Sequence, residues 1–299
     1  MKIGSHFVNF SVPGGTRALP VTLAGAARAA EEAGACWFTM ADHFFQMDNM
    51  WPAEEPMLEV FSSLAFLAGQ TTRIKLAVFV AGVTYRYPAV LAKTVTTLDV
   101  LSQGRAIFGI GAAWYEREHV GLGVPYPPTK ERFERLEETL QICQQLWSDN
   151  NGAYQGHHYQ LGETLCSPQP VQRPWPPILI GGTGERKTLR LVAQYADSWN
   201  GHFASVEEAA HKVDVLHRHC DAVGRNPADI QKSAFLVIDP FEDLDGFLAT
   251  AEQYGNLGFD LINILSPTSQ ADPVGFVNRL GEQLIPKAAQ LGPQVAGAR

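Results

Sequence analysis

Residues 74–110 read IKLAVFVAGVTYRYPAVLAKTVTTLDVLSQGRAIFGI. The apolar run Ile74–Ala81 is typical of a buried strand, and Pro88–Leu101 has the length and composition of a helix. Arg105–Ile110 is then a second strand, which ends in glycine-rich sequence. A strand, a helix and a strand in succession predict two parallel strands that are joined by a crossover helix.

The same alternation extends over the whole chain. Further strands are predicted at Lys2–Phe10, Cys36–Ala41, Ile178–Ile180, Asp197–Asn200, Lys232–Ile238 and Phe259–Leu265. Further helices are predicted at Pro20–Glu32, Pro56–Gln70, Thr129–Trp147, Glu185–Tyr195, Val206–Val223, Leu244–Tyr254 and Pro273–Leu284. We expect Gly34 to end the first helix and Thr129 to cap the fourth.

Eight strands that alternate with eight helices favour a (β/α)8 TIM barrel, formed by residues 1–299 as a single domain. The segment Asn150–Pro177 interrupts this alternation with Gly, Pro and polar residues. We therefore expect an insertion between the fourth helix and the fifth strand, with a small hairpin near Tyr154–Leu161. Periodicity alone leaves an open, doubly wound sheet as the alternative.

Composition excludes several classes of protein. The 299 residues are 45% hydrophobic and 18% charged, with a net charge of −8 and no basic tract. This argues against nucleic acid or an anionic membrane as the partner. The longest apolar runs reach about half of the roughly 20 residues of a membrane span. The N-terminus has no signal-peptide pattern, so we expect a cytoplasmic protein.

The sequence suggests no metal site. The four cysteines are widely separated and form no Cys-x-x-Cys motif, which indicates neither a disulfide scaffold nor a zinc site. His217 and His219 are two positions apart on a predicted helix and point to different sides of it. His157 and His158 lie in the irregular insertion.

Asp42 and His43 directly follow a predicted strand. In a barrel, the carboxyl ends of the strands carry the chemistry. Because histidine titrates near neutral pH, His43 is suited to proton donation beside a redox cofactor. The alternative is a structural pair in which Asp42 only orders the turn.

The segment Gly109–Glu116, GIGAAWYE, follows another strand. It lacks the third glycine of a dinucleotide-binding fingerprint. Its glycines would still allow close approach of the backbone to a flat ligand, with Glu116 at the rim. The alternative is a tight turn that carries a surface glutamate.

Residues 178–188, ILIGGTGERKT, lead from a strand through three glycines into a helix. Unpaired N–H groups and the positive end of the helix would face one point, which favours a phosphate site. Thr183 could add a hydroxyl, and Arg186 or Lys187 a charge. The spacing does not match a P-loop, and an ordinary strand–helix turn is the alternative.

Together, these segments resemble the bacterial luciferase-like superfamily and, within it, the coenzyme F420-dependent oxidoreductases. The matching residues span most of the first 200 positions in the right order. They are Ala41–Phe44, Thr84–Pro88, Ala92-Lys93, Thr97–Asp99, Ser102–Arg105, Gly109–Glu118, Arg132–Glu137, Gly181–Gly184 and Ala196–Asn200.

The resemblance implies a TIM barrel with an insertion, and a cis peptide bond without proline after the third strand, here Gly82–Val83. By similarity, the residues that line the cofactor ring are Asp42, Gly82, Val83, Gly109 and Gly111. The residues that hold its phosphate are Gly181, Gly182, Gly184 and Glu185. His43 and Glu116 match the acid and base of the sugar-phosphate dehydrogenases in this group.

The chain departs from those dehydrogenases in its substrate residues. The lysines and arginine with which they bind a substrate phosphate have no match here. At the mouth of the predicted barrel the chain instead has large apolar side chains. These suit an apolar or conjugated substrate. The alternative is that they simply pack the lid loops. The candidate substrate-binding residues are Phe44, Trp51, Trp114, Tyr115 and Trp199.

We therefore expect an oxidoreductase that transfers a hydride between coenzyme F420 and a small, largely apolar enone, imine or ketone. The first alternative is an FMN-dependent monooxygenase with the same fold. Others are a family member that binds the cofactor without turnover, and a non-redox phosphate-binding barrel enzyme. The resemblance also implies a homodimer.

Overall fold

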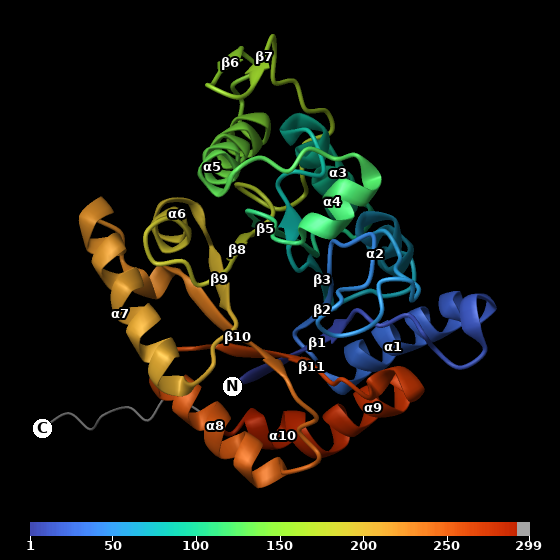
Figure 1. The fold of residues 1–299 in the computed structure, drawn as a ribbon. Helices are drawn as coiled ribbons and strands as arrows, with labels where there is room; N and C mark the ends of the chain where they lie inside the picture. Colours follow the sequence, from blue (N-terminus) through green and yellow to red (C-terminus); the bar gives the residue numbers. More distant parts are fainter. Residues whose placement is uncertain (292–299) are drawn as a thin grey trace, which may run out of the picture. The chain divides into compact units, whose positions relative to one another are not determined.

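The computed structural model describes residues 1–291 (Figure 1). These residues fall into two compact units. The first unit combines Met1–Thr39 with the described chain from Gly182 onward. The second unit is the continuous stretch Met40–Gly181. Whether the chain folds as a single domain remains a prediction.

The first unit contains a parallel sheet. Its strands lie in the order β2 (Trp37–Met40, whose last residue begins the second unit), β1 (Lys2–Phe7), β11 (Leu261–Leu265), β10 (Gln231–Val237) and β9 (Ser198–Gly201). In this register Ile262 pairs with Ile3 on one side and with Ala234 on the other. Ile3, Ala234 and Ile262 are all buried, as expected for the interior of a parallel sheet.

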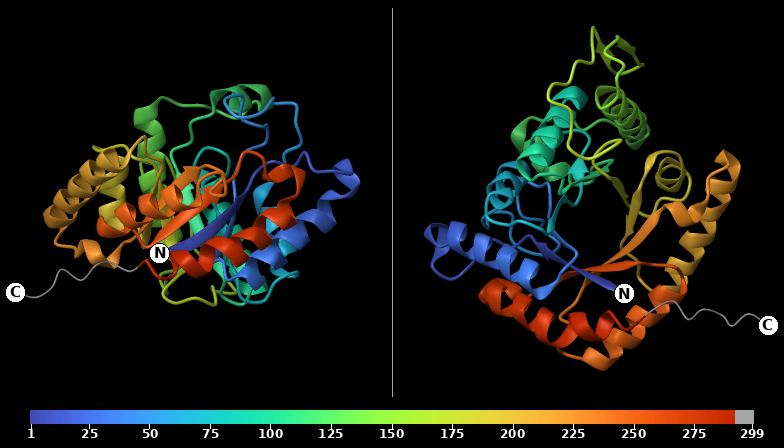
Figure 2. Two further views of the ribbon diagram at one scale, coloured as in Figure 1. Left: turned by 90° about the horizontal axis from the view of Figure 1, so that it is seen from below. Right: turned by 180° about the vertical axis from the view of Figure 1, so that it is seen from behind.

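Helices accompany these strands along the chain. They are α1 (Leu19–Ala33), α6 (Thr188–Tyr195), α7 (Val206–Val223), α8 (Leu244–Asn256), α9 (Pro273–Arg279) and α10 (Ile285–Ala288). Both views of Figure 2 show α1 and α9 side by side. Helix α1 ends as predicted at Gly34, whose φ of 81° requires the left-handed backbone that glycine adopts freely.

The second unit has its own parallel strands. They are β3 (Lys75–Val78), β5 (Ala106–Gly111) and β8 (Ile178–Gly181), with β5 between the other two, and the short β4 (Ala81–Gly82) also pairs with β5. The helices are α2 (Val60–Ala68), α3 (Pro88–Leu101), α4 (Glu116–Leu122) and α5 (Thr129–Leu146). The predicted hairpin is confirmed as β6 (Tyr154–Gln155) and β7 (Gln160–Leu161).

Several predicted boundaries need correction. Thr129 is the first residue of α5 rather than its cap, and Pro128 occupies the cap position. Helix α6 begins at Thr188, three residues later than predicted, because the glycine-rich turn continues through Lys187. The predicted final helix passes into a π-helical turn at Leu280–Leu284. Helix α4 was not predicted, because its seven residues are too short to show a helical period.

Candidate active site

A buried carboxylate lies against a histidine in the second unit. His43 follows β2, and its Nδ1 atom lies 2.6 Å from Oε1 of Glu118 on α4. The Glu118 side chain is completely buried, whereas that of His43 is 12% exposed. Oε2 of Glu118 accepts the backbone N–H groups of Phe44 at 2.7 Å and Phe45 at 3.2 Å. The hydroxyl of Tyr85 donates to Oε1. Glu118 therefore fixes the loop after β2 as well as the imidazole.

These contacts keep Glu118 ionised. Burial by itself would raise its pKa, but the hydrogen bond and charge of His43, followed by the bonds from Tyr85 and Phe44, hold that pKa below its usual value. Burial and the neighbouring Glu118 carboxylate raise the pKa of Tyr85, so its hydroxyl keeps its proton. An ionised carboxylate only accepts hydrogen bonds, so Nδ1 of His43 carries the hydrogen. Nε2 is then the atom of His43 that can exchange a proton.

A second charged group connects the segments around this pair. Arg86 binds Asp42 with both terminal nitrogens, at 2.7 and 3.0 Å, and also binds Glu59 at 2.6 Å. Oδ2 of Asp42 also accepts the backbone N–H of Gly82 at 3.1 Å. Burial raises the pKa of Asp42, and the charge of Arg86 opposes this shift. The carboxylate of Asp42 is thus occupied by partners from the protein itself.

Aromatic side chains surround His43. Its ring meets that of Trp114 at 5.4 Å and that of Tyr115 at 5.8 Å, both edge to face. Trp114 is 54% exposed, whereas Tyr115 is buried and donates its hydroxyl to Asp48 at 2.8 Å. Phe44 and Trp51 are half-buried. Of the predicted substrate residues in this unit, Trp114 presents the most open apolar surface.

The cis peptide bond is displaced from its predicted position. It joins Phe79 and Val80, not Gly82 and Val83. The prediction placed the end of the strand at Ala81, whereas β3 ends at Val78 and the chain bends before β4. The resemblance thus correctly implied a cis bond without proline after the third strand, but at the wrong pair of residues.

Val80 explains why three neighbouring positions are glycine. A Cβ atom on Gly109, Gly111 or Gly181 would lie 3.0–3.1 Å from the methyl groups of Val80. On Gly109 it would also lie 2.1 Å from the carbonyl oxygen of Val78, which is a clash. Val80 itself remains half-buried. The three glycines therefore leave room for the apolar side chain of Val80. The five predicted ring-lining residues are all buried.

The predicted phosphate segment of the first unit is open. Gly182, with a φ of 119°, and Gly184 are exposed, and no side chain caps the following helix α6. The carboxylate of Glu185 instead binds Lys212 at 2.7 Å and His211 at 3.1 Å. The N–H of Gly182 donates to the carbonyl oxygen of Asn200 at 2.9 Å, so the prediction of an unpaired N–H group is wrong at this glycine. The exposed backbone of Gly184 remains a means by which this segment could hold a phosphate.

Trp199 has a different environment from the other predicted substrate residues. It is completely buried, and its Nε1 donates to the carbonyl oxygen of Gly182 at 2.8 Å. Its ring contacts those of Phe203 and Phe259. In this structure Trp199 belongs to the core of the first unit.

Sequence reasoning did not single out Glu118, Tyr85 and Arg86. Glu116, predicted as a catalytic residue at the rim, is exposed as the first residue of α4. Residues two positions apart on a helix point to different sides, so only one of Glu116 and Glu118 can face His43. Choosing between them requires the orientation of α4, which no local pattern supplies.

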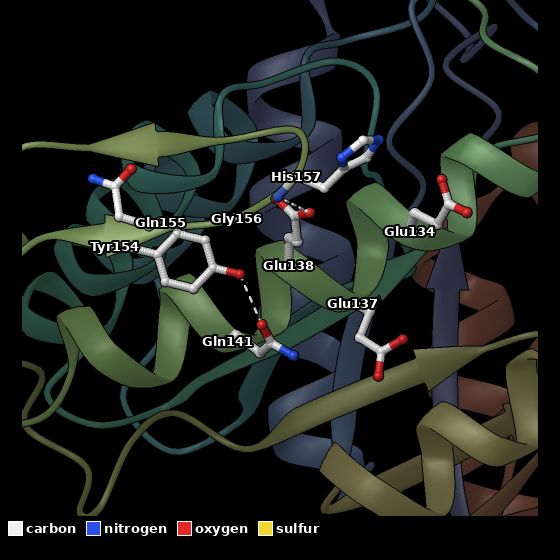
Figure 3. Close-up of a pocket in the computed structure, with 8 residues that line it drawn as sticks. All are labelled: Glu134, Glu137, Glu138, Gln141, Tyr154, Gln155, Gly156 and His157. Carbon is white, nitrogen blue, oxygen red and sulfur yellow. Dashed lines mark hydrogen bonds between the residues drawn. The ribbon is translucent and has the colours of Figure 1, made fainter.

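A hollow of about 420 Å³ lies between α5 and the β6–β7 hairpin (Figure 3). Glu138 accepts the backbone N–H groups of His157 at 2.8 Å, His158 at 3.0 Å and Tyr159 at 3.0 Å. The hydroxyl of Tyr154 donates to Gln141 at 2.7 Å (Figure 3). This carboxylate therefore anchors the hairpin to α5.

Two other features are absent from residues 1–291. No group of three or more His, Cys, Asp or Glu side chains there is arranged to hold a metal ion. None of the helices there is both long enough and apolar enough to cross a bilayer.

The family model for luciferase-like monooxygenases matches residues 1–261. The chain therefore belongs to this family, which confirms the resemblance. Its fold is supported by the similarity of this structure to that of the coenzyme F420 dependent tetrahydromethanopterin reductase from Methanopyrus kandleri. The two structures align with a TM-score of 0.77 at 16% identity, covering 95% of this chain and 98% of that one. The predicted (β/α)8 barrel fold is confirmed.

Two curated relatives differ in cofactor. The F420-dependent glucose-6-phosphate dehydrogenase of Kineococcus radiotolerans is 36% identical over 169 residues, covering 56% of this chain and 49% of that protein. The FMNH2-dependent dimethylsulfone monooxygenase of Pseudomonas putida is 29% identical over 159 residues, covering 52% and 42%. The matches thus span less than half of either relative. They support an oxidoreductase and leave the choice between the two cofactors open.

Proposed function

We propose that this protein is an oxidoreductase that transfers a hydride between coenzyme F420 and a small, largely apolar enone, imine or ketone. The observation that carries the proposal is the pairing of His43 with the ionised, buried Glu118. A histidine held by a carboxylate at one nitrogen can move a proton at the other, as the reduction of a C=O, C=N or activated C=C bond requires.

The chain has features that fit such a cofactor. Val80, supported by three glycines and half-buried, offers an apolar surface of the kind that a flat ring needs. Gly184, before the uncapped α6, offers exposed backbone for a phosphate. When bound, the deazaflavin supplies the hydride. The proposed ring-lining and phosphate-binding residues remain those implied by the resemblance.

The residues of the second unit then have distinct roles. Nε2 of His43 donates the proton to the acceptor, and Glu118 stabilises the charged imidazole. Glu116, exposed at the start of α4, remains a candidate to deliver a proton through water. The exposed ring of Trp114 orients an apolar acceptor beside His43. The apolar ring of Trp114 offers no positive charge to a phosphate, so we do not expect a sugar phosphate as the substrate.

An FMN-dependent monooxygenase is the second candidate. It is favoured by the similarity to the dimethylsulfone monooxygenase, whose name states an FMNH2 requirement. The uncapped α6 and the exposed Gly184 suit either cofactor, because both carry a phosphate on a ribityl chain. A family member that binds a cofactor without turnover is the third candidate.

Paired titrations of the cofactor-free protein with F420 and with FMN test the proposal by fluorescence quenching. We expect micromolar or tighter binding of F420 alone, followed by turnover of an enone, imine or ketone. Preference for FMN, together with oxygen uptake, would move the protein to the monooxygenases. Tight F420 binding without turnover of any acceptor would favour the third candidate.

We also propose that the protein forms a homodimer. Tyr87, just before α3, and Val90 and Leu101 on α3 are apolar side chains with large exposed fractions. Association through such a face would remove them from water. Light scattering after gel filtration measures the mass directly, and a monomer at micromolar concentration would contradict this proposal.

A further inference from the structure

We propose that Tyr85 is a positioning residue for His43: through its hydrogen bond to Glu118, it sets how strongly the imidazole holds the transferred proton. The catalytic part of this inference rests on the proposed function. The effect on His43 itself depends only on the contacts within the second unit.

The ring of Tyr85 is held from several sides. Its backbone N–H donates to the carbonyl oxygen of Gly82 at 3.1 Å, which folds the residue back over that glycine. A Cβ on Gly82 would lie 2.5 Å from the tyrosine ring, so only glycine leaves room for it. His119 stacks on the ring at 4.5 Å, and Phe44 meets it edge to face at 5.2 Å. The hydroxyl therefore has a defined direction.

That hydroxyl and His43 share one oxygen atom. Both the Tyr85 hydroxyl and Nδ1 of His43 bind Oε1 of Glu118, while Oε2 is bound by two backbone N–H groups. A protonated phenol can only donate to an ionised carboxylate. Each donor on the carboxylate reduces the negative charge that the others experience. Loss of the Tyr85 donor should therefore strengthen the attraction between Glu118 and a protonated His43.

The other ionisable groups around His43 and Glu118 have partners of their own. Asp42 is bound by Arg86, and Asp48 is bound by Arg117 and the Tyr115 hydroxyl.

His119, the neighbour of Glu118 on α4, lies between the carbonyl oxygen of Tyr115 at 2.7 Å and the hydroxyl of Thr84 at 2.6 Å.

A hydrogen-bonding arrangement for His119 follows from these contacts. The Tyr115 carbonyl can only accept, so Nδ1 of His119 carries a hydrogen, and Nε2 shares the other hydrogen bond with the Thr84 hydroxyl. Both ring nitrogens of His119 thus have partners other than Glu118 and His43. Removal of the Tyr85 hydroxyl should accordingly affect His43 mainly through Glu118.

Tyr85→Phe removes the hydroxyl and keeps the ring. Tyr126→Phe is the matched control, because the Tyr126 ring contacts the same His119 at 4.7 Å but its hydroxyl donates to the carbonyl oxygen of Trp114 at 2.9 Å. NMR titration of the His43 imidazole in cofactor-free protein should show the midpoint moving up by about half a unit to one unit in Tyr85→Phe. Tyr126→Phe should match the wild type. An unchanged midpoint in Tyr85→Phe, or an equal shift in both variants, would overturn the inference.

A second substitution guards against poor folding of Tyr85→Phe. Incorporation of 3-fluorotyrosine at position 85 keeps the ring and makes the hydroxyl a stronger donor, so the midpoint of His43 should move down. A shift in the same direction as in Tyr85→Phe would contradict the proposed role.

The pH dependence of kcat tests the catalytic part of the inference separately from the imidazole titration. With F420 and an accepted substrate, the alkaline limb of the kcat profile should move up in Tyr85→Phe by the same amount as the imidazole titration. An unmoved alkaline limb alongside a shifted imidazole would refute the catalytic part. If no substrate is turned over, the proposed function fails while the imidazole titration still decides whether Tyr85 acts on His43.

Discussion

Nδ1 of His43 lies 2.6 Å from Oε1 of Glu118, and the carboxylate side chain is completely buried. The two residues are 75 positions apart in the chain and come from the loop after β2 and from α4. Because the carboxylate also binds the backbone of Phe44 and Phe45, the contact positions the loop that carries His43. The pair therefore links the local fold to the proposed chemistry.

His43→Ala should lower turnover by about 10²–10⁴-fold, because it removes the group proposed to transfer the proton. The affinity for F420 should change little, since this role does not include holding the cofactor. Steady-state kinetics and a binding titration measure the two effects. His157→Ala, an exposed histidine of the hairpin segment, is the control. Equal turnover in His43→Ala and wild type would remove His43 from the mechanism.

Glu118→Gln should make stability less sensitive to acid. The pKa of Glu118 is lowered in the folded protein from its ordinary value of 4.5. Its ionised form therefore contributes stability that is fully present above pH 4.5 and is lost as the pH falls through the folded-state pKa.

Urea unfolding at pH 6 and at pH 3.5 or below measures this dependence. The difference in unfolding free energy between wild type and Glu118→Gln should shrink toward the lower pH. A difference that is constant or grows would show that the ionised carboxylate is not the stabilising form.

Arg86→Met should destabilise the protein by about 3–5 kcal/mol, because it leaves the buried Asp42 carboxylate without its counter-charge. Arg117→Met is the matched control. Arg117 also binds two carboxylates, those of Asp48 and Glu54, but its side chain is 50% exposed. Thermal unfolding should therefore show a much smaller loss for the control. Similar losses in both variants would mean that burial of the ion pair does not determine its importance.

Gly109→Ala should cost at least about 2 kcal/mol or prevent folding, because its Cβ would lie 2.1 Å from the backbone oxygen of Val78. Gly162→Ala adds the same methyl group where no atom lies within 4 Å, and should change stability by less than about 0.5 kcal/mol. Urea unfolding compares the two variants. A tolerated alanine at position 109 would show that the glycine is not required for packing against β3.

Much of the fold could be predicted from local pattern. Helices α3 and α7 begin and end at the predicted residues, because proline or a serine cap marks their starts and the apolar period is clear. The exact end of β3 could not be predicted. Its apolar run continues past Val78 into the bend that contains the cis bond, and side-chain type does not report such a bend.

Local sequence patterns were enough to predict the alternation of strands and helices, the hairpin in the insertion, the family, and the position of His43 at the end of a strand. These depend on composition and spacing over short distances. Three features became known only from the folded structure: Glu118 rather than Glu116 contacts His43, Arg86 binds Asp42, and Trp199 is buried. Each of these contacts depends on how elements far apart in the chain are rotated against one another, and a pattern along the chain does not encode that rotation.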